Sequence, residues 1–245
     1  MGQSETSLGG LLALCLAAAI PIAAAQAESA VPFELSQKFV TEHKVKSLVG
    51  PSVQVDEQGQ VSLAWMEEDK DVRSVLYARS AEAGGPMGVP VRINRPEDVP
   101  YWRQEAPALV VQGEDVFVTW GLAHPKATPQ QPFATELRLS RSIDGGKTFQ
   151  PSVAVNDDPG VIQHTFDALH RDADGRLHLS WIDGREGKKE PGTYVARSLD
   201  RGATITRNLK VDEGTCVCCR TAVTSGPEGM VYVAWRKIFE GNVRE

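Results

Sequence analysis

Alternating apolar and polar residues dominate the chain from residue 51 onward. Four segments share one pattern: a short apolar run, a turn with glycine, and a second alternating run that ends in tryptophan. They read PSVQVDEQGQVSLAW, PALVVQGEDVFVTW, DALHRDADGRLHLSW and TAVTSGPEGMVYVAW. A period of two interrupted by a polar, glycine-containing turn is typical of a β-hairpin. Each segment therefore predicts two antiparallel strands.

The tryptophans that end these segments repeat at a nearly constant spacing. They are Trp65, Trp120, Trp181 and Trp235, so the pattern recurs with a period typical of structural repeats. After three of them, a polar loop leads to another alternating run, SVLYARS, ELRLSRS or TYVARS, which predicts a third strand. Because the tryptophans recur at one strand position, we expect them to pack in a core rather than to stack on sugars.

A serine, aspartate, glycine and threonine motif follows the third strand. It is intact in SIDGGKTF and nearly so in SLDRGATI, where isoleucine replaces the aromatic residue, and it is degenerate in SAEAGG. The aspartate can accept N–H groups of its own turn, and glycine permits positive φ. The motif predicts a structural turn, with Thr148 and Phe149 beginning the fourth strand. Its residues are Ser142, Asp144, Gly146, Thr148, Phe149, Ser198, Asp200, Gly202 and Thr204.

Four antiparallel strands in each repeat of about 55 residues describe the blades of a β-propeller. The repeated motif is the Asp-box, and residues 28–245 resemble the sialidase-like (BNR/Asp-box) propellers. The resemblance implies an all-β fold with six blades when complete, of which this sequence supplies about four. We expect the chain to be a C-terminally truncated part of a longer protein; the alternative is a propeller closed by oligomerisation.

The stretch 1–27 predicts a signal peptide. The run LLALCLAAAIPIAAA is followed by AQA, which has the small residues of a cleavage site. We therefore expect a periplasmic or secreted protein, with an uncleaved anchor or a lipoprotein at Cys15 as alternatives. No later apolar run is long enough to span a membrane. The net charge is −6 without a basic stripe, so we expect no nucleic-acid partner.

The resemblance implies a glycoside hydrolase of exo-α-sialidase type acting on terminal sialic acid or other acidic glycans. Such chemistry uses an arginine cluster for the carboxylate, a tyrosine nucleophile paired with glutamate, and an acidic acid/base. The tyrosine and glutamate are expected in later blades. Charged residues predicted for the face that carries the loops after the tryptophans are Arg103, Glu105, Asp183, Arg185, Arg220 and Arg236. The alternative for each is a solvated loop charge.

A second candidate site is the cysteine cluster TCVCCR. Cys218 precedes Trp235 by the same sequence interval as His164 precedes Trp181, which predicts equivalent positions in adjacent blades. Cys216, Cys218, Cys219 and His164 could then bind Cu(I) or Zn(II), with His124 as an additional ligand. A disulfide with one spare thiol, or a reactive thiol, remains open. The corresponding function is a non-catalytic periplasmic propeller that binds a metal or a partner through this face.

Overall fold

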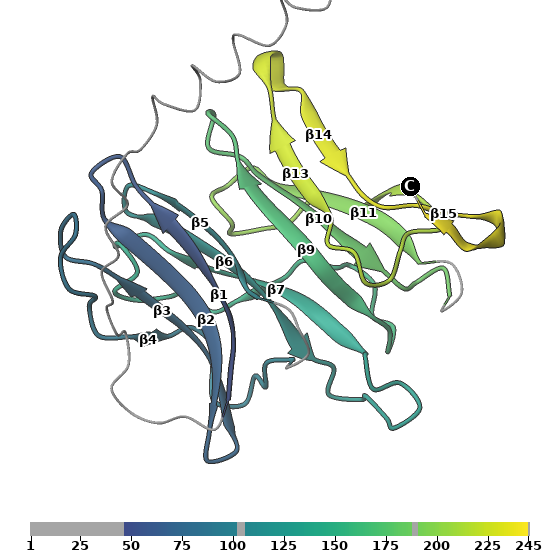
Figure 1. Cartoon of the computed structure of the whole chain (residues 1–245), viewed down its shortest axis with the longest axis horizontal. Coiled ribbons are helices and arrows are strands. Elements are labelled where there is room, and N and C mark those ends of the chain that lie inside the picture. The colour runs from purple at the N-terminus through teal and green to yellow at the C-terminus, as the bar shows by residue number, and fades with distance from the viewer. Residues whose placement is uncertain (1–46, 102–105, 188–190, 245) are drawn as a thin grey trace, which may run out of the picture. The chain divides into compact units, whose positions relative to one another are not determined.

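The strands of this protein form antiparallel sheets that follow one another along the chain (Figure 1). The computed structural model describes residues 47–101, 106–187 and 191–244, which belong to the compact unit Phe39–Glu245. The expected signal peptide, residues 1–27, lies outside the described residues. Within the described ranges, no helix is long and apolar enough to cross a bilayer.

Three sheets have four strands each, in chain order, and all neighbouring strands are antiparallel. The first sheet contains β1 (Ser47–Val55), β2 (Val61–Asp69), β3 (Val72–Arg79) and β4 (Val91–Arg92). The second contains β5 (Ala108–Gln112), β6 (Asp115–Ala123), β7 (Thr135–Ser142) and β8 (Val153–Ala154). The third contains β9 (His164–Arg171), β10 (Leu177–Asp183), β11 (Gly192–Ser198) and β12 (Leu209–Asp212).

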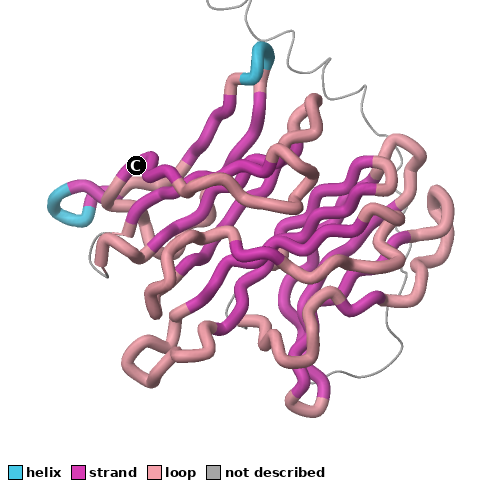
Figure 2. The backbone as a smooth tube through the Cα atoms, turned by 180° about the vertical axis from the view of Figure 1, so that it is seen from behind, coloured by secondary structure: helices cyan, strands magenta, loops and turns pink. Residues whose placement is uncertain are grey.

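A fourth unit consists of two hairpins. They are formed by β13 (Ala222–Ser225) with β14 (Val231–Ala234), and by β15 (Ile238–Phe239) with β16 (Val243–Arg244). In the described part of the chain, helix is limited to the short 3-10 turns η1 (Pro227–Gly229) and η2 (Glu240–Asn242) (Figure 2). The first strands β1, β5, β9 and β13 contact one another in succession. This is the arrangement of propeller blades, and it confirms the predicted all-β fold.

Hydrophobic side chains pack between successive sheets. Trp120 of β6 and Tyr77 of β3 belong to the core between the first and second sheets. Trp181 of β10 and Phe117 of β6 belong to the core between the second and third sheets. Neither tryptophan is more than 1% exposed. The prediction that these two tryptophans are core residues is confirmed, because aromatic rings of this size bury the apolar area that holds neighbouring sheets together.

Hydrogen bonds within the Asp-box of the second sheet close its turn. Thr148 donates to the Asp144 carboxylate from its backbone N–H at 3.0 Å and from its hydroxyl at 2.6 Å. The Ser142 hydroxyl donates to the same carboxylate at 2.6 Å and accepts the Gly146 N–H at 2.9 Å. These bonds, first that from Ser142 and then those from Thr148, hold the pKa of Asp144 well below its usual range.

The Asp-box of the third sheet has the same connections. Thr204 donates its N–H and its hydroxyl to Asp200, at 2.9 and 2.6 Å. Ser198 donates to Asp200 at 2.8 Å and accepts the Gly202 N–H at 2.8 Å. These hydrogen bonds, first those from Thr204, lower the pKa of Asp200 to about 2. Both carboxylates are therefore fully engaged in turn structure at neutral pH, as expected for a structural motif.

The Asp-box of the second sheet also contacts the sheet before it. Gly146 has a φ of +86°, and a Cβ atom at this position would overlap the ring of Tyr77. Phe149 packs edge-on against the same ring, with 5.5 Å between the ring centroids. The turn therefore both reverses the chain and sets how closely the two sheets approach each other.

This contact explains why the fourth strand is shorter than predicted. We expected it to begin at Thr148 and Phe149, but β8 begins at Val153. Thr148 is held in the turn by Asp144, and Phe149 is packed on the preceding sheet. The Thr148 N–H is therefore not available for strand pairing, and backbone bonding to β7 starts at the Gln150 N–H, which donates to the Arg141 carbonyl at 2.9 Å.

Substitution of Gly146 tests this contact. We expect Gly146→Ala to lower the free energy of unfolding by about 2–5 kcal/mol, because the strain of positive φ adds to the overlap with Tyr77. Gly113→Ala is the matched control, since Gly113 has a φ of +60° but open space around it. The control should lose only about 1–2 kcal/mol. Urea denaturation followed by tryptophan fluorescence measures both, and equal losses would contradict a role for the Tyr77 contact.

Candidate functional site

The loops after the second strands and the segments that lead into the first strands meet on one face of the sheets, called here the loop face. In three units, the residue three positions after the tryptophan donates its backbone N–H to the lead-in segment. The pairs are Ala123 to Val99 at 2.9 Å, Gly184 to Gln163 at 2.9 Å, and Ile238 to Gly214 at 2.7 Å. Arg103 and Glu105, predicted for this face, lie outside the described residues.

This register aligns Thr215, and not Cys218, with His164. His164 pairs with Asp183, two positions after Trp181, and Thr215 pairs with Lys237, two positions after Trp235. Thr215 is three positions further from its tryptophan than His164 is from Trp181. The equivalence predicted from equal spacing is therefore wrong, because the fourth unit has a longer segment between the bridge and the tryptophan.

The cysteine turn occupies this longer segment. The Cys219 N–H donates to the Cys216 carbonyl at 3.3 Å, and Cys216 Sγ lies 3.1 Å from Cys219 Sγ and 3.5 Å from Cys218 Sγ. None of the three is in a disulfide bond, and all three sulfurs lie within 4.8 Å of one another. Cys216 is fully buried, Cys219 is half-buried and Cys218 is exposed. Cys216 raises the pKa of Cys218, first through their hydrogen bond and then through its charge.

The structure does not bring the predicted imidazole ligands to the sulfurs; among the described residues, only the three cysteines form a group that could hold a metal. The buried His164 donates from Nδ1 to the Thr135 carbonyl at 2.6 Å. Its Nε2 has no hydrogen-bond partner within the described ranges and lies 3.7 Å from the Asp183 carboxylate. His124 Nδ1 accepts the Lys126 N–H at 3.1 Å.

The buried Asp183 and the half-buried Arg185 form an ion pair. Asp183 is fully buried and accepts Arg185 Nε at 3.0 Å, Arg185 Nη2 at 2.9 Å and the Trp181 indole N–H at 2.9 Å. Arg185 Nη1 also donates to Asp157 at 2.9 Å. Burial acts to lower the pKa of the Arg185 guanidinium, but the hydrogen bonds and charges of Asp183 and Asp157 have the larger combined effect and raise this pKa. The donors that would grip a substrate carboxylate are therefore already occupied.

The other two predicted arginines make different contacts. Arg220 donates to the backbone carbonyls of Asp167, at 2.5 Å, and Ala106, at 2.9 Å, so it links the segments that precede β5 and β13 to strand β9. Arg236 is exposed, and its Nη1 lies 3.8 Å from Cys219 Sγ. The loop face therefore brings Arg236 to the cysteine turn and keeps Arg185 with its own carboxylates.

A tyrosine and glutamate pair is present that the sequence reasoning missed. The Tyr194 hydroxyl donates to Glu186 at 2.5 Å, and the Arg185 guanidinium lies 4.3 Å from the centre of the tyrosine ring. Burial, followed by the Glu186 hydrogen bond, raises the pKa of Tyr194. The two residues lie on opposite sides of a loop, and only strand pairing between β10 and β11 brings them together.

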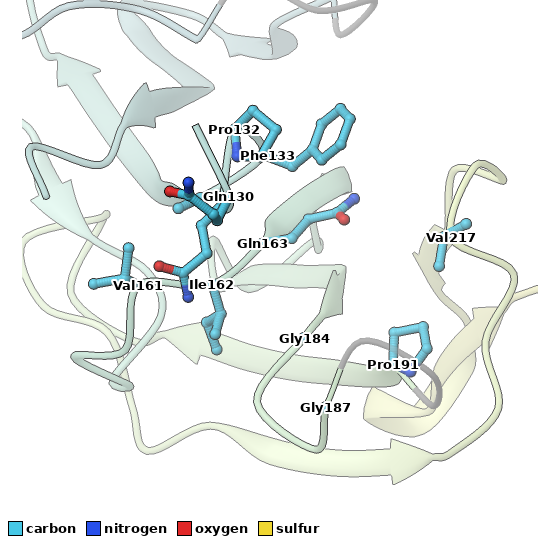
Figure 3. A pocket seen from close by; sticks show the side chains of 12 residues that line it. Gln130, Pro132, Phe133, Val161, Ile162, Gln163, Gly184, Gly187, Pro191 and Val217 are labelled. Carbon is cyan, nitrogen blue, oxygen red and sulfur yellow. The ribbon is translucent and has the colours of Figure 1, made fainter. Parts of the chain in front are cut away.

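A cavity of about 290 Å³ opens on the loop face. Figure 3 shows its lining, which comes from the loops of the second and third units and from Val217 of the cysteine turn. Gln130 and Gln163 contribute amides, and Phe133, which is 46% exposed, contributes an apolar ring. The cavity therefore combines hydrogen-bonding groups with an apolar wall beside the residue that separates Cys216 from Cys218.

Removal of Arg185 tests whether it stabilises the fold. We expect Arg185→Ala to lower the free energy of unfolding by about 3–5 kcal/mol, because Asp183 would remain buried without its counter-charge. Arg236→Ala removes an exposed guanidinium and should change stability by at most about 0.5 kcal/mol. Thermal and urea denaturation measure both variants. An Arg185→Ala protein as stable as the Arg236→Ala protein would contradict this assignment.

No protein-family model matches the sequence, and no curated protein matches it significantly. Several solved structures match the fold. They include a family 117 glycoside hydrolase from Zobellia galactanivorans (14% identity, TM-score 0.54, 80% of this chain and 64% of that one). Another match is an α-L-arabinanase from Penicillium chrysogenum complexed with arabinobiose (12% identity, TM-score 0.52, 79% of this chain and 60% of that one). A third is a Trypanosoma rangeli sialidase in complex with sialic acid (17% identity, TM-score 0.52, 87% of this chain and 37% of that one). The chain thus spans less than two thirds of each of these proteins. Its fold is that of the sialidase-like β-propellers.

Proposed function

We propose that this propeller binds one thiophilic metal ion, Cu(I) or Zn(II), through Cys216, Cys218 and Cys219. The observation that supports the proposal is the convergence of three cysteine sulfurs, none of them in a disulfide bond, within 4.8 Å of one another. In a tetrahedral site with metal–sulfur bonds of about 2.3 Å, the ligand sulfurs are about 3.8 Å apart. The observed separations of 3.1 and 3.5 Å therefore require only small side-chain movements.

Charge and exposure at the cysteine turn fit a bound cation. Thiolates are soft ligands that favour Cu(I) and Zn(II), and three of them leave excess negative charge around either ion. Arg236, 3.8 Å from Cys219 Sγ, partly offsets that charge. The exposed Cys218 leaves the ion open to solvent or to a ligand from another molecule. The predicted signal peptide would deliver this site to the periplasm or the cell exterior.

Metal titration of the reduced full chain tests the proposal. We expect one equivalent of Cu(I) or Zn(II) per chain, measured against a chromophoric chelator without oxygen. Each of Cys216→Ser, Cys218→Ser and Cys219→Ser should lower the affinity by more than about 100-fold, since loss of an outer-shell partner alone costs roughly 10- to 100-fold.

His164→Gln is the matched control, because His164 is a buried imidazole of the loop face outside the sulfur group. It should retain the full stoichiometry and affinity. A chain that binds neither ion, or three serine variants that bind as tightly as the parent, would overturn the proposal. Circular dichroism establishes that each variant keeps its β structure.

A second candidate function is glycoside hydrolysis of sialidase type on terminal acidic sugars. It is favoured by the Tyr194–Glu186 pair under the Arg185 guanidinium, since a tyrosine with a neighbouring carboxylate is the nucleophile of sialidases. The fold matches a sialidase solved with sialic acid. Two observations weaken it: Tyr194 is only 4% exposed, and Asp183 is bound by Arg185 and Trp181. The geometry therefore supports metal binding better.

Turnover of chromogenic sialosides tests this second function. If Tyr194 is the nucleophile, Tyr194→Phe should reduce kcat by at least about 100-fold without changing metal stoichiometry, because covalent catalysis depends on the phenol oxygen. Glu186→Gln should also reduce kcat, since the proton acceptor for the phenol is lost. Absence of turnover in the parent chain, or full activity in Tyr194→Phe, would exclude this role for Tyr194.

A further inference from the structure

We propose that Cys216 and Cys219 form a redox-active dithiol that exchanges with small disulfides, and that its oxidation and metal binding exclude each other. The second half of this inference rests on the proposed metal site. The first half rests on the shape of the cysteine turn alone. The inference therefore assigns the three thiols unequal roles, with Cys216 and Cys219 as the reversible pair and Cys218 as a single thiol.

Distance and chain geometry select this pair from the three possible ones. Cys216 Sγ is closer to Cys219 Sγ, at 3.1 Å, than to Cys218 Sγ, at 3.5 Å. The Cys219 N–H to Cys216 carbonyl hydrogen bond already holds the two residues in one turn. A bond between the adjacent Cys218 and Cys219 would strain the backbone, because disulfide Cα atoms normally lie about 4.4–6.8 Å apart.

Burial decides the order of events. Within the pair, Cys216 is fully buried and Cys219 is half-buried, so an external disulfide reaches Cys219 before Cys216, and the exposed Cys218 can form a separate mixed disulfide. The Cys219 thiolate attacks one sulfur of the external disulfide, forms a mixed disulfide and releases one thiolate. The Cys216 thiolate then attacks the Cys219 sulfur and releases the second thiolate. Two electrons pass to the external disulfide, which becomes two thiols, and the protein gains one disulfide bond.

Oxidation removes two of the three sulfur ligands from the proposed metal site. A disulfide sulfur carries no thiolate charge, so only Cys218 remains as a thiolate ligand. We expect oxidation to lower metal affinity by more than about 100-fold, more than the roughly 10- to 100-fold cost of losing an outer-shell partner. A bound ion should in turn slow the reaction with external disulfides, because its ligands are no longer available as nucleophiles.

Oxidised glutathione is the probe for the test. The reduced, metal-free full chain is treated with excess probe, alkylated and mapped by mass spectrometry. We expect a Cys216–Cys219 bond with Cys218 outside it, either alkylated or joined to glutathione, and reversal by reduced glutathione. Cys218→Ser should form the same bond, whereas Cys216→Ser should stop as a mixed disulfide with glutathione. A main product that joins Cys218 to either neighbour, or no intramolecular bond, would overturn the dithiol assignment.

The two proposals fail separately. If the bond forms but the reduced chain binds neither Cu(I) nor Zn(II), the dithiol stands and the proposed function fails. If one equivalent of metal binds but the oxidised chain binds it equally well, the metal site stands and the mutual exclusion is wrong. Preloading the chain with one equivalent of Zn(II) should slow glutathione-driven oxidation at least about tenfold, and an unchanged rate would also contradict the exclusion.

Discussion

The packing of one sheet against the next depends on how closely the Asp-box turn approaches its neighbour. In the second sheet, Asp144 holds Thr148 and Ser142 in a tight turn. The turn places Gly146 against the ring of Tyr77 in the preceding sheet, where a side chain would overlap. Gly202 of the third sheet approaches the second sheet less closely, since an added Cβ atom would lie 3.3 Å from Leu139 and Phe117. In the second and third sheets, a hydrogen-bonded carboxylate at the edge of the sheet thus holds the turn that packs against the preceding sheet.

The opposite edge of the sheets carries the candidate chemistry, and there the backbone register is equally regular. The same N–H to carbonyl pair joins the lead-in segment to the second-strand loop in three units. Between this bond and the tryptophan, the second and fourth units have three more residues than the third, and in the fourth unit this longer segment contains the turn that gathers the cysteines. The site therefore lies on a loop of a repeated scaffold, as functional residues on rigid frameworks generally do.

The charges of the loop face show why metal binding is better supported than recognition of an acidic sugar. Arg185 is neutralised by Asp183 and Asp157, and Arg220 is used to join backbone segments. The guanidinium of Arg236 faces a sulfur. A propeller fold does not fix its chemistry, since similar scaffolds carry different sites. What distinguishes this chain is three cysteines in one turn, two of which, Cys216 and Cys219, are also close enough to form a disulfide bond with each other.

The sequence by itself determined the propeller, because strand alternation, the tryptophan period and the Asp-box are all local signals that repeat. It also identified the cysteine cluster, whose members lie within four positions. Only the tertiary structure decided that His164 is kept apart from these sulfurs and that Tyr194 meets Glu186. Those outcomes depend on hydrogen-bond register between strands and on loop length. Equal spacing to a tryptophan cannot reveal them, because a difference of three residues in segment length between units moves residues in space without disturbing the local pattern.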